Sequence, residues 1–226
     1  MDLSELNRLN EELAEITAQL EYRNRCLRNE NEVKEKKAAL EARNALYDRA
    51  ARSVEKELSQ NEQAFLAIGA ESEEEFREKL AEIAVRNAYI KRRCNMELLR
   101  ADTGELSVKE LGTALWESCE YLKLCGVSAA ALTQGDTMLP ADRILAAYGF
   151  FEALIEACKP WPKEILVNLS ATAEEVWMRM NLTVLGSLPS EDLPGRILPR
   201  SRVSASYANE DGVLYYRLLL KKGGDA

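Results

Sequence analysis

The chain has 226 residues, of which 46% are hydrophobic and 30% are charged, a balance typical of a soluble protein with one or two folded domains. Its formal net charge of −8 argues against a general nucleic-acid binder, because neutralising phosphates requires a net basic surface or a large basic patch. The sequence contains no histidine, which excludes a zinc site of cysteine and histidine, and we expect no metal site.

Single cysteines and the absence of a long apolar run indicate the compartment. The cysteines form no CxxC pair and are expected to be reduced core residues. No apolar stretch approaches the roughly 20 residues that span a bilayer, and no signal peptide is visible at the first residues. We therefore expect a cytoplasmic protein, either as such or as the cytoplasmic part of a membrane-associated sensor. The five cysteines are Cys26, Cys94, Cys119, Cys125 and Cys158.

The N-terminal region has the pattern of a coiled coil. Apolar residues recur at alternating spacings of three and four, the phase slips around residues 23–31, and a spacing of seven resumes from Val33 to Val54. A single helix from about Ser4 to Leu66 is predicted. Such a helix cannot bury its apolar stripe alone, so we expect a homodimer; a rod that only separates its two ends is the alternative. The first seam residues are Leu6, Leu9, Leu13, Ile16 and Leu20.

Two further helices are predicted after a break at residues 67–70. Ser72 with Glu75 is typical of a capping box, and Ser107 with Glu110 is a second candidate for one. A turn at residues 102–105 would join the two helices into a hairpin, and two copies of the hairpin would form a four-helix bundle. The first helix has an apolar face of Phe76, Leu80, Ile83, Ile90, Cys94 and Leu98, and the second has one of Leu111, Leu115, Cys119 and Leu122.

The remainder of the chain changes character, since all six prolines lie from Pro140 onward and the helical period gives way to alternation. The pattern predicts a small α/β sandwich with helices on one face. We expect a strand at 127–133, a helix at 140–158, strands at 165–170 and 176–184, a proline-rich loop at 185–200, and a hairpin of 202–207 with 213–220.

The predicted fold class is therefore α+β, with three domains. A coiled-coil signalling helix would occupy residues 1–68, a dimerisation hairpin residues 69–125, and an α/β domain residues 126–226.

Several segments together resemble one family. They are Tyr89-Ile90-Lys91-Arg92-Arg93 followed by Asn95, Glu110-Leu111, Glu117-Ser118 to Leu122, Gly126-Val127, and Phe151 to Glu156. In this order they resemble the cytoplasmic part of a divergent bacterial sensor histidine kinase, a two-component signal transduction protein. The resemblance implies a helical dimerisation region and a GHKL-type ATPase-like domain at the C-terminal end.

The chain departs from that family where phosphate would be accepted. The resemblance places the acceptor region near Ala88 and Tyr89, where an active member has a histidine followed by an acidic residue. Neither residue can form a phosphoramidate. The degenerate region predicted here consists of Ala88, Tyr89, Lys91, Arg92, Arg93 and Asn95.

The nucleotide motifs that the resemblance implies are also altered. Glu152 and Glu156 match the Glu-x-x-x-Asn motif, so a glutamate replaces the asparagine that helps to hold Mg²⁺. Between Met180 and Arg202 the only glycines are Gly186 and Gly195, and no Asp-x-Gly-x-Gly motif precedes them. We expect a remnant of a nucleotide site at Glu152 and Glu156, no catalytic residue and no cofactor; ATP with Mg²⁺ is the disfavoured alternative.

Three arginines at a spacing of seven form a basic strip on the first hairpin helix: Arg86, Arg93 and Arg100. One interpretation is a docking strip for an acidic partner such as a response-regulator receiver domain. The favoured interpretation is a charged face paired with glutamates of a neighbouring helix.

The sequence thus predicts a dimeric pseudokinase, a signalling module that binds partners without transferring phosphate. Two alternatives stay open. One is an ATP-binding kinase or phosphotransferase with an acceptor other than histidine, and the other is a structural coiled-coil adaptor.

Overall fold

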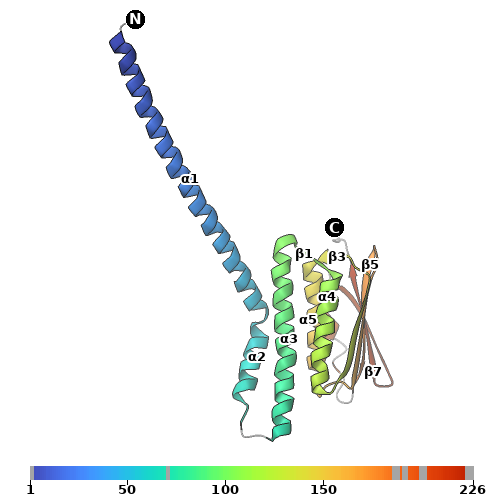
Figure 1. Ribbon diagram of the computed structural model, residues 1–226. Helices are drawn as coiled ribbons and strands as arrows, with labels where there is room; N and C mark the ends of the chain where they lie inside the picture. Colours follow the sequence, from blue (N-terminus) through green and yellow to red (C-terminus); the bar gives the residue numbers. More distant parts are fainter. Residues whose placement is uncertain (1–2, 70–71, 185–188, 190–192, 199–202, 222–226) are drawn as a thin grey trace. The chain divides into compact units, whose positions relative to one another are not determined.

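The computed structural model describes residues 3–69, 72–184, 189, 193–198 and 203–221 (Figure 1). It divides into two compact units, Met1–Asp48 and Arg49–Ala226. Within the described residues, no helix has both the length and the apolar character that crossing a membrane requires.

Helix α1 (Leu3–Ser53) forms the whole of the described part of the first unit. Its seam side chains face solvent in the single chain: Leu13 is 59% exposed, Ile16 is 56% exposed and Leu20 is 57% exposed. The side chains of Leu6 and Leu9 lie outside the described set. An apolar stripe this exposed is what a coiled coil would cover.

The predicted continuous helix to Leu66 is wrong, because α1 ends at Ser53 and α2 (Glu55–Leu66) begins after a turn at Val54. Val54 is 1% exposed within the second unit. Burying a valine side chain contributes about 2 kcal/mol, more than the net gain from one helical hydrogen bond. The break therefore keeps Val54 in the core of the second unit at the expense of helix continuity.

Helix α3 (Glu73–Thr103) starts at the predicted capping box, which is confirmed: Ser72 accepts from the backbone N–H of Glu75, whose side chain accepts from the backbone of Ser72. The helix ends at Gly104, whose φ of 72° is the left-handed conformation that glycine adopts without strain. Helices α2 and α3 lie side by side (Figure 1), and Asn61 Nδ2 donates to Asn87 Oδ1 across 2.9 Å.

Helix α4 (Val108–Leu122) is packed differently from the prediction. It contacts α3, but it also lies over β2 and β4 and contributes Leu111, Leu115 and Leu122 to the core of the sandwich. A side chain at Gly112 would overlap Thr133, so helix and strand approach closely there. The three-domain division stays a prediction, but the helix assigned to the dimerisation hairpin shares its core with the sheet.

The start of α4 also differs in detail. Ser107 does cap the helix, since its Oγ accepts from the backbone N–H of Lys109. The predicted capping box with Glu110 is wrong, because the hydroxyl of Ser107 donates to Asp136 Oδ1 across 2.6 Å. The carboxylate of Asp136 also meets Lys109 Nζ at 3.3 Å, and these contacts lower the pKa of Asp136.

A five-stranded mixed sheet forms the C-terminal part, in the order β2-β4-β5-β7-β6. Strand β2 is parallel to β4 and the other pairs are antiparallel, while β1 and β3 form a separate antiparallel pair. The strands are β1 (Glu105–Ser107), β2 (Ser128–Gln134), β3 (Met138–Pro140), β4 (Glu164–Ala171), β5 (Glu175–Thr183), β6 (Val203–Glu210) and β7 (Val213–Lys221).

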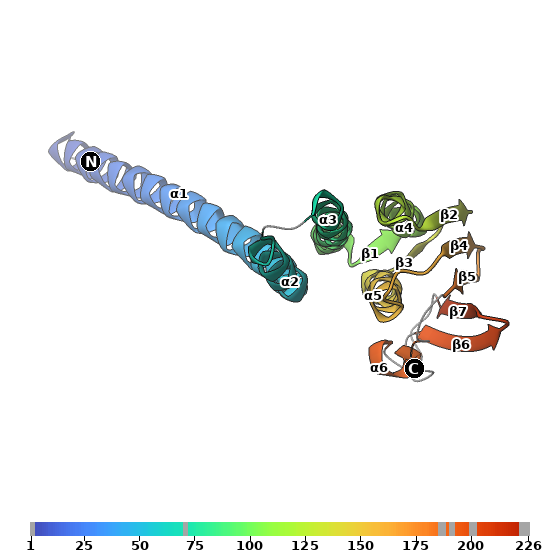
Figure 2. The same ribbon diagram turned by 90° about the horizontal axis from the view of Figure 1, so that it is seen from below.

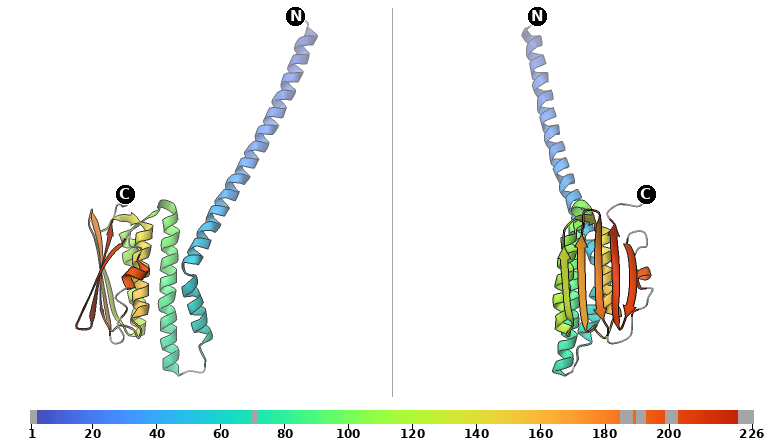
Figure 3. Two further views of the ribbon diagram at one scale, coloured as in Figure 1. Left: turned by 180° about the vertical axis from the view of Figure 1, so that it is seen from behind. Right: turned by 90° about the vertical axis from the view of Figure 1, so that its right-hand side faces the viewer.

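Helices α4 and α5 (Ala141–Ala157) cover one face of this sheet, and α3 lies on their far side (Figure 2). The predicted strands, the hairpin and the one-sided helical layer are confirmed. The right-hand view of Figure 3 looks onto the other face of the sheet, and no helix in the described residues of the second unit lies over it.

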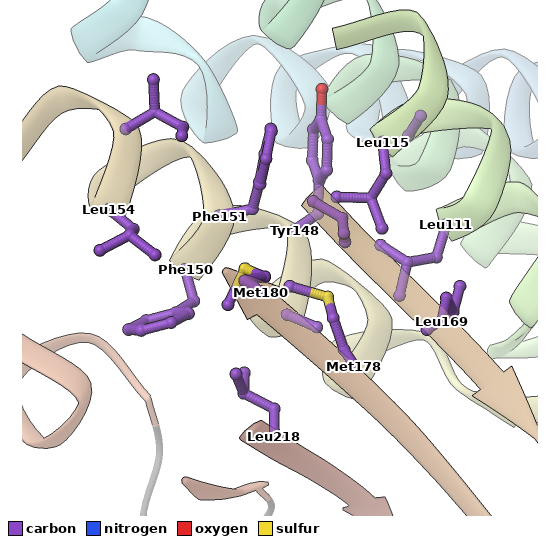
Figure 4. Close-up of a cluster of buried hydrophobic side chains, with 14 of the residues drawn as sticks. Leu111, Leu115, Tyr148, Phe150, Phe151, Leu154, Leu169, Met178, Met180 and Leu218 are labelled. Atoms are coloured by element: carbon purple, nitrogen blue, oxygen red, sulfur yellow. The ribbon is translucent and has the colours of Figure 1, made fainter. Parts of the chain in front are cut away.

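The core lies between the sheet and this helical pair (Figure 4). Val176, Met178, Met180 and Leu182 point inward from β5, as their alternation predicts, and each is at most 1% exposed. They meet Phe150 and the other apolar side chains of α5.

The proline-rich segment contains a short helix, α6 (Leu193–Ile197), where a loop was predicted. Gly195 lies in α6, and Gly186 lies outside the described residues.

All five cysteines lie in the described part of the chain and are free thiols. Cys119 and Cys158 are buried as predicted, and burial raises the pKa of Cys119 to about 12. Cys26 is exposed on α1, so the expectation of a core residue is wrong there.

Candidate functional site between α3 and α5

Residues three or four apart lie on the same side of a helix, so the side chains of α5 described here fall on two faces. Phe150 and Leu154 point toward the sheet, while the hydroxyl end of Tyr148 points away from it (Figure 4). One turn further along that outer face stand Glu152 and then Glu156. The outer face therefore carries both glutamates that the resemblance assigns to a nucleotide site.

Helix α3 presents a matching face. Arg86, Tyr89 and Arg93 are spaced three and four residues apart, so all three project to one side. The ring of Tyr89 meets the rings of Tyr148 and Phe151 edge-on, with 6.2 Å between ring centres in both cases. This aromatic contact fixes α3 against α5 and brings the arginines level with the glutamates.

Two arginines of α3 neutralise the two glutamates of α5. Arg93 Nη1 donates to Glu152 Oε2 across 3.0 Å. Arg86 Nε lies 3.8 Å from Glu156 Oε1, and the other oxygen of Glu156 is 3.2 Å from Lys159 Nζ. Glu82 joins the network, since one of its oxygens is 3.4 Å from both Arg86 and Lys159. Both carboxylates are therefore held by cations of the chain itself.

Burial sets the electrostatics of this cluster. Removal of Glu152 from water raises its pKa to about 7, although the neighbouring Arg93 guanidinium lowers it. Burial also raises the pKa of Tyr89 well above its ordinary value. The hydroxyl of Tyr89 and Oε1 of Glu152 have no hydrogen-bond partner among the described residues. Tyr89 and Glu152 are therefore enclosed with one unpaired polar atom each, whereas the side chains of Lys159 and Glu156 are 31% and 35% exposed.

A second set of contacts ties α3 to α4. Glu117 receives both Lys91, with Nζ 2.7 Å from Oε1, and the guanidinium of Arg92. Helix α4 is in turn joined to α5, because the hydroxyl groups of Ser118 and Tyr148 are 2.9 Å apart and form a buried hydrogen bond. Helix α3 is thus clamped to both helices of the sandwich by charged pairs.

The residues of the predicted acceptor region have different surroundings in the structure. Ala88 is 3% exposed and Tyr89 is 2% exposed, so these positions point into the helical contact. Lys91, Arg92 and Arg93 form the ion pairs described above, whereas Asn95 is exposed. A side chain at position 88 or 89 is enclosed by protein and cannot meet a nucleotide without moving α3.

The three arginines of the basic strip form ion pairs with glutamates of the same chain. Arg86 and Arg93 face glutamates of α5, and Arg100 Nη1 lies 3.7 Å from Glu97 on its own helix. This geometry matches the favoured interpretation of a charged face paired with a neighbouring helix. The docking role stays a prediction.

Sequence reasoning missed several members of the cluster. Lys159 follows Glu156 by three residues and Tyr148 precedes Glu152 by four, and both spacings place the side chains on one helical face. Those spacings were available signals. Glu117 and Glu82 carried no comparable signal, because their roles depend on how α3 lies on the sandwich.

The cluster does not suit a divalent cation in this arrangement. Mg²⁺ prefers oxygen ligands in an octahedral arrangement. Here the carboxylates face guanidinium and ammonium groups, which an arriving cation would have to displace. Within the described residues, no group of three or more histidine, cysteine, aspartate and glutamate side chains is placed to hold a metal ion.

The described residues thus form a five-stranded mixed sheet with α4 and α5 on one face and α3 packed on those helices. No protein-family model matches the chain, and no curated protein sequence matches it significantly. Solved structures of histidine kinases are similar to it, each with a TM-score below 0.5.

Three of these structures are histidine kinases. The histidine kinase domain of a blue-light activated kinase from Erythrobacter litoralis has 8% identity and a TM-score of 0.45, over 76% of this chain and 96% of its own. Acinetobacter baumannii AdeS has 10% identity and a TM-score of 0.41, over 76% and 98%. The kinase ThkA, in complex with the response regulator TrrA, has 10% identity and a TM-score of 0.40, over 78% and 60%.

Proposed function

We propose that the chain is a histidine-kinase-like signalling module that works by binding and not by phosphoryl transfer, in other words a pseudokinase. The observation that carries the proposal is the pairing of Glu152 and Glu156 with Arg93, Arg86 and Lys159. The resemblance assigns these glutamates to a nucleotide site, and α3 neutralises them. The absence of histidine from the sequence supports the same conclusion, since no imidazole can accept phosphate.

We also propose that the module is a homodimer. The seam of α1 is one support. A second is the apolar surface that α2 and α3 leave exposed: Phe65 is 62% exposed, Phe76 is 41% exposed and Leu98 is 38% exposed. Phe76 and Leu98 belong to the apolar face predicted for α3, whose opposite side packs on the sandwich. Covering this surface with a second copy would give a four-helix bundle of α2 and α3, whereas the bundle predicted from the sequence combines α3 with α4.

In this proposal a signal moves α3. The helix contacts α2 on one side and α4 and α5 on the other, so a change in the dimer contact would be transmitted to the sandwich. A receiver domain is the partner class that the sequence resemblance suggests.

Calorimetry with ATP, with and without Mg²⁺, tests the proposal on the whole chain. We expect no binding at millimolar nucleotide. Mg²⁺-dependent binding that Glu152→Gln and Glu156→Gln both abolish would overturn it and favour a kinase with a non-histidine acceptor. Two double variants make the test more specific. Arg86→Ala with Arg93→Ala removes the arginines that pair with Glu156 and Glu152. Arg77→Ala with Lys36→Ala is the control, because it removes two exposed cations elsewhere.

Phosphoryl transfer is measured separately by incubation with radiolabelled ATP. We expect no label on the protein. Labelling that is stable in acid would indicate a hydroxyl acceptor and would contradict the pseudokinase proposal.

A further inference from the structure

The uncovered face of the sheet carries a defined pattern of side chains, because strand register fixes which residues lie next to each other. One row across β4, β5, β7 and β6 consists of Asn168, Arg179, Arg217 and Ser206. The row on one side contains Trp177 and Leu219. The row on the other side contains Asn181 and Tyr215.

The two arginines are directly opposite each other on adjacent antiparallel strands. Like charges directly opposite each other on neighbouring strands destabilise a sheet. Both side chains are exposed, and within the described residues neither has a salt-bridge partner. They are also the only charged residues in these three rows, which include Leu132 and its neighbours on β2. The pair is therefore a local concentration of positive charge on this face that is open to an anionic group.

The surroundings of the arginine pair suit a protein ligand. Trp177 is half-buried, and its indole N–H donates to Glu175 Oε2 across 3.0 Å, which holds the ring beside the pair. On the other side, a surface hollow of about 400 Å³ is lined by Ser206, Tyr207, Ala208, Glu210, Tyr215 and Arg217, so it holds one carboxylate beside the arginine. Arginine, tryptophan and tyrosine are the residues that most often dominate binding energy at protein interfaces.

We propose that this face, called here the Arg179–Arg217 face, binds an acidic segment of a partner protein. Carboxylates of the segment would accept hydrogen bonds from the two guanidinium groups, which are suited to paired contacts with carboxylates. The charge complementarity is local, since the chain as a whole has a net charge of −8 and repels anions that make no direct contact.

Nucleic acid is the less suitable occupant. Its affinity comes from neutralising many phosphates, and this face offers two cations. A few carboxylates spaced along an extended segment match two arginines better. The proposal goes beyond the pseudokinase function and does not depend on whether nucleotide binds.

Fluorescence anisotropy on the whole chain tests the proposal. The probe is a short labelled peptide of alternating glutamate and leucine, compared with one of alternating glutamine and leucine and with a labelled oligothymidine. We expect binding of the acidic peptide only, weakened by salt. Arg179→Glu should reduce its affinity by about tenfold or more, equivalent to about 1.4 kcal/mol.

The same variant separates binding from folding. Arg179→Glu faces Arg217 with an opposite charge, so we expect its thermal midpoint to rise while its affinity falls. The matched control, Arg23→Glu on α1, makes the same charge change away from the sheet and should leave affinity unchanged. If Arg179→Glu does not fold, Arg179→Gln replaces it, with the same expected loss.

Several outcomes would overturn the proposal. They are no binding of the acidic peptide, equal binding by Arg179→Glu and wild type, an equal loss in Arg23→Glu, and tighter binding of oligothymidine than of the peptide.

Discussion

Arg93 of α3 and Glu152 of α5 are 59 residues apart in sequence, and their side chains meet in a hydrogen bond of 3.0 Å. Glu152 is 6% exposed, so its carboxyl group is almost entirely removed from water. A Cβ at Gly149, one turn earlier on α5, would lie 3.8 Å from the Arg93 guanidinium, which is an ordinary van der Waals contact. The arginine of one helix thus substitutes for solvent around the glutamate of the other.

Replacing Arg93 with alanine should destabilise the protein by about 2 kcal/mol. The physical reason is that breaking a buried pair leaves an uncompensated carboxyl group, and partial exposure of Arg93 reduces the full effect. Urea unfolding followed by circular dichroism measures the change. Arg77→Ala on the same helix is the control, because its ion pair with Glu73 is exposed and should contribute little. Equal effects of the two changes would contradict the importance of the Arg93–Glu152 pair.

The stability of the protein should depend on the protonation of Glu152. Its pKa is raised from 4.5 to about 7 in the folded state, so folding favours the protonated form. The stabilisation from that proton is full below about pH 4.5 and is lost as the pH rises through about 7. Arg93 opposes the shift, while the charges of Glu57 and Glu156 support it.

Glu152→Gln should therefore be more stable than wild type at pH 8 and equal to it at pH 4, below the unfolded pKa of 4.5. The difference at pH 8 has an upper limit of about 3.5 kcal/mol, because one pKa unit corresponds to about 1.4 kcal/mol. Thermal midpoints at the two pH values measure it. A difference of the same size at both pH values would show that the effect of the substitution does not come from the titration of Glu152.

The contribution of Tyr89 to the stability of the protein can be divided between its ring and its hydroxyl group. The ring packs edge-on against Tyr148 and Phe151, and the hydroxyl group is buried without a partner among the described residues. Tyr89→Phe should leave stability unchanged or increase it, whereas Tyr89→Ala should cost about 3–5 kcal/mol. Urea unfolding distinguishes the two. A large loss in Tyr89→Phe would indicate a hydrogen bond to the hydroxyl group.

The sequence predicts the sheet well because alternation is a local signal. In the strands from residue 165 onward, apolar and polar residues alternate with a period of two. Val176, Met178, Met180 and Leu182 point inward, as that period requires. The capping box at Ser72 is equally local, since it depends on residues three apart.

Long-range packing accounts for what the sequence does not predict. Helix α4 is amphipathic whether it lies in a hairpin or on a sheet, so its pattern alone does not reveal that it covers β2. The pairing of Arg93 with Glu152 likewise depends on which face of α3 turns toward α5. Of the apolar face predicted for α3, Phe76, Leu80 and Leu98 are exposed but Ile83 is buried, and Tyr89 lies on the face that packs on α5.

The last prediction concerns the apolar seam of α1. Ile16 is 56% exposed in the single chain, and a coiled-coil partner would bury it. Ile16→Glu should shift the protein from dimer to monomer at micromolar concentration, because a carboxylate in the seam loses its hydration on association. The control, Ala18→Glu, lies off the seam on the same helix and should remain dimeric. Light scattering coupled to size-exclusion chromatography measures both masses. A monomeric wild type would contradict the proposed dimer, and a dimeric Ile16→Glu would move the contact from α1 to the exposed surface of α2 and α3.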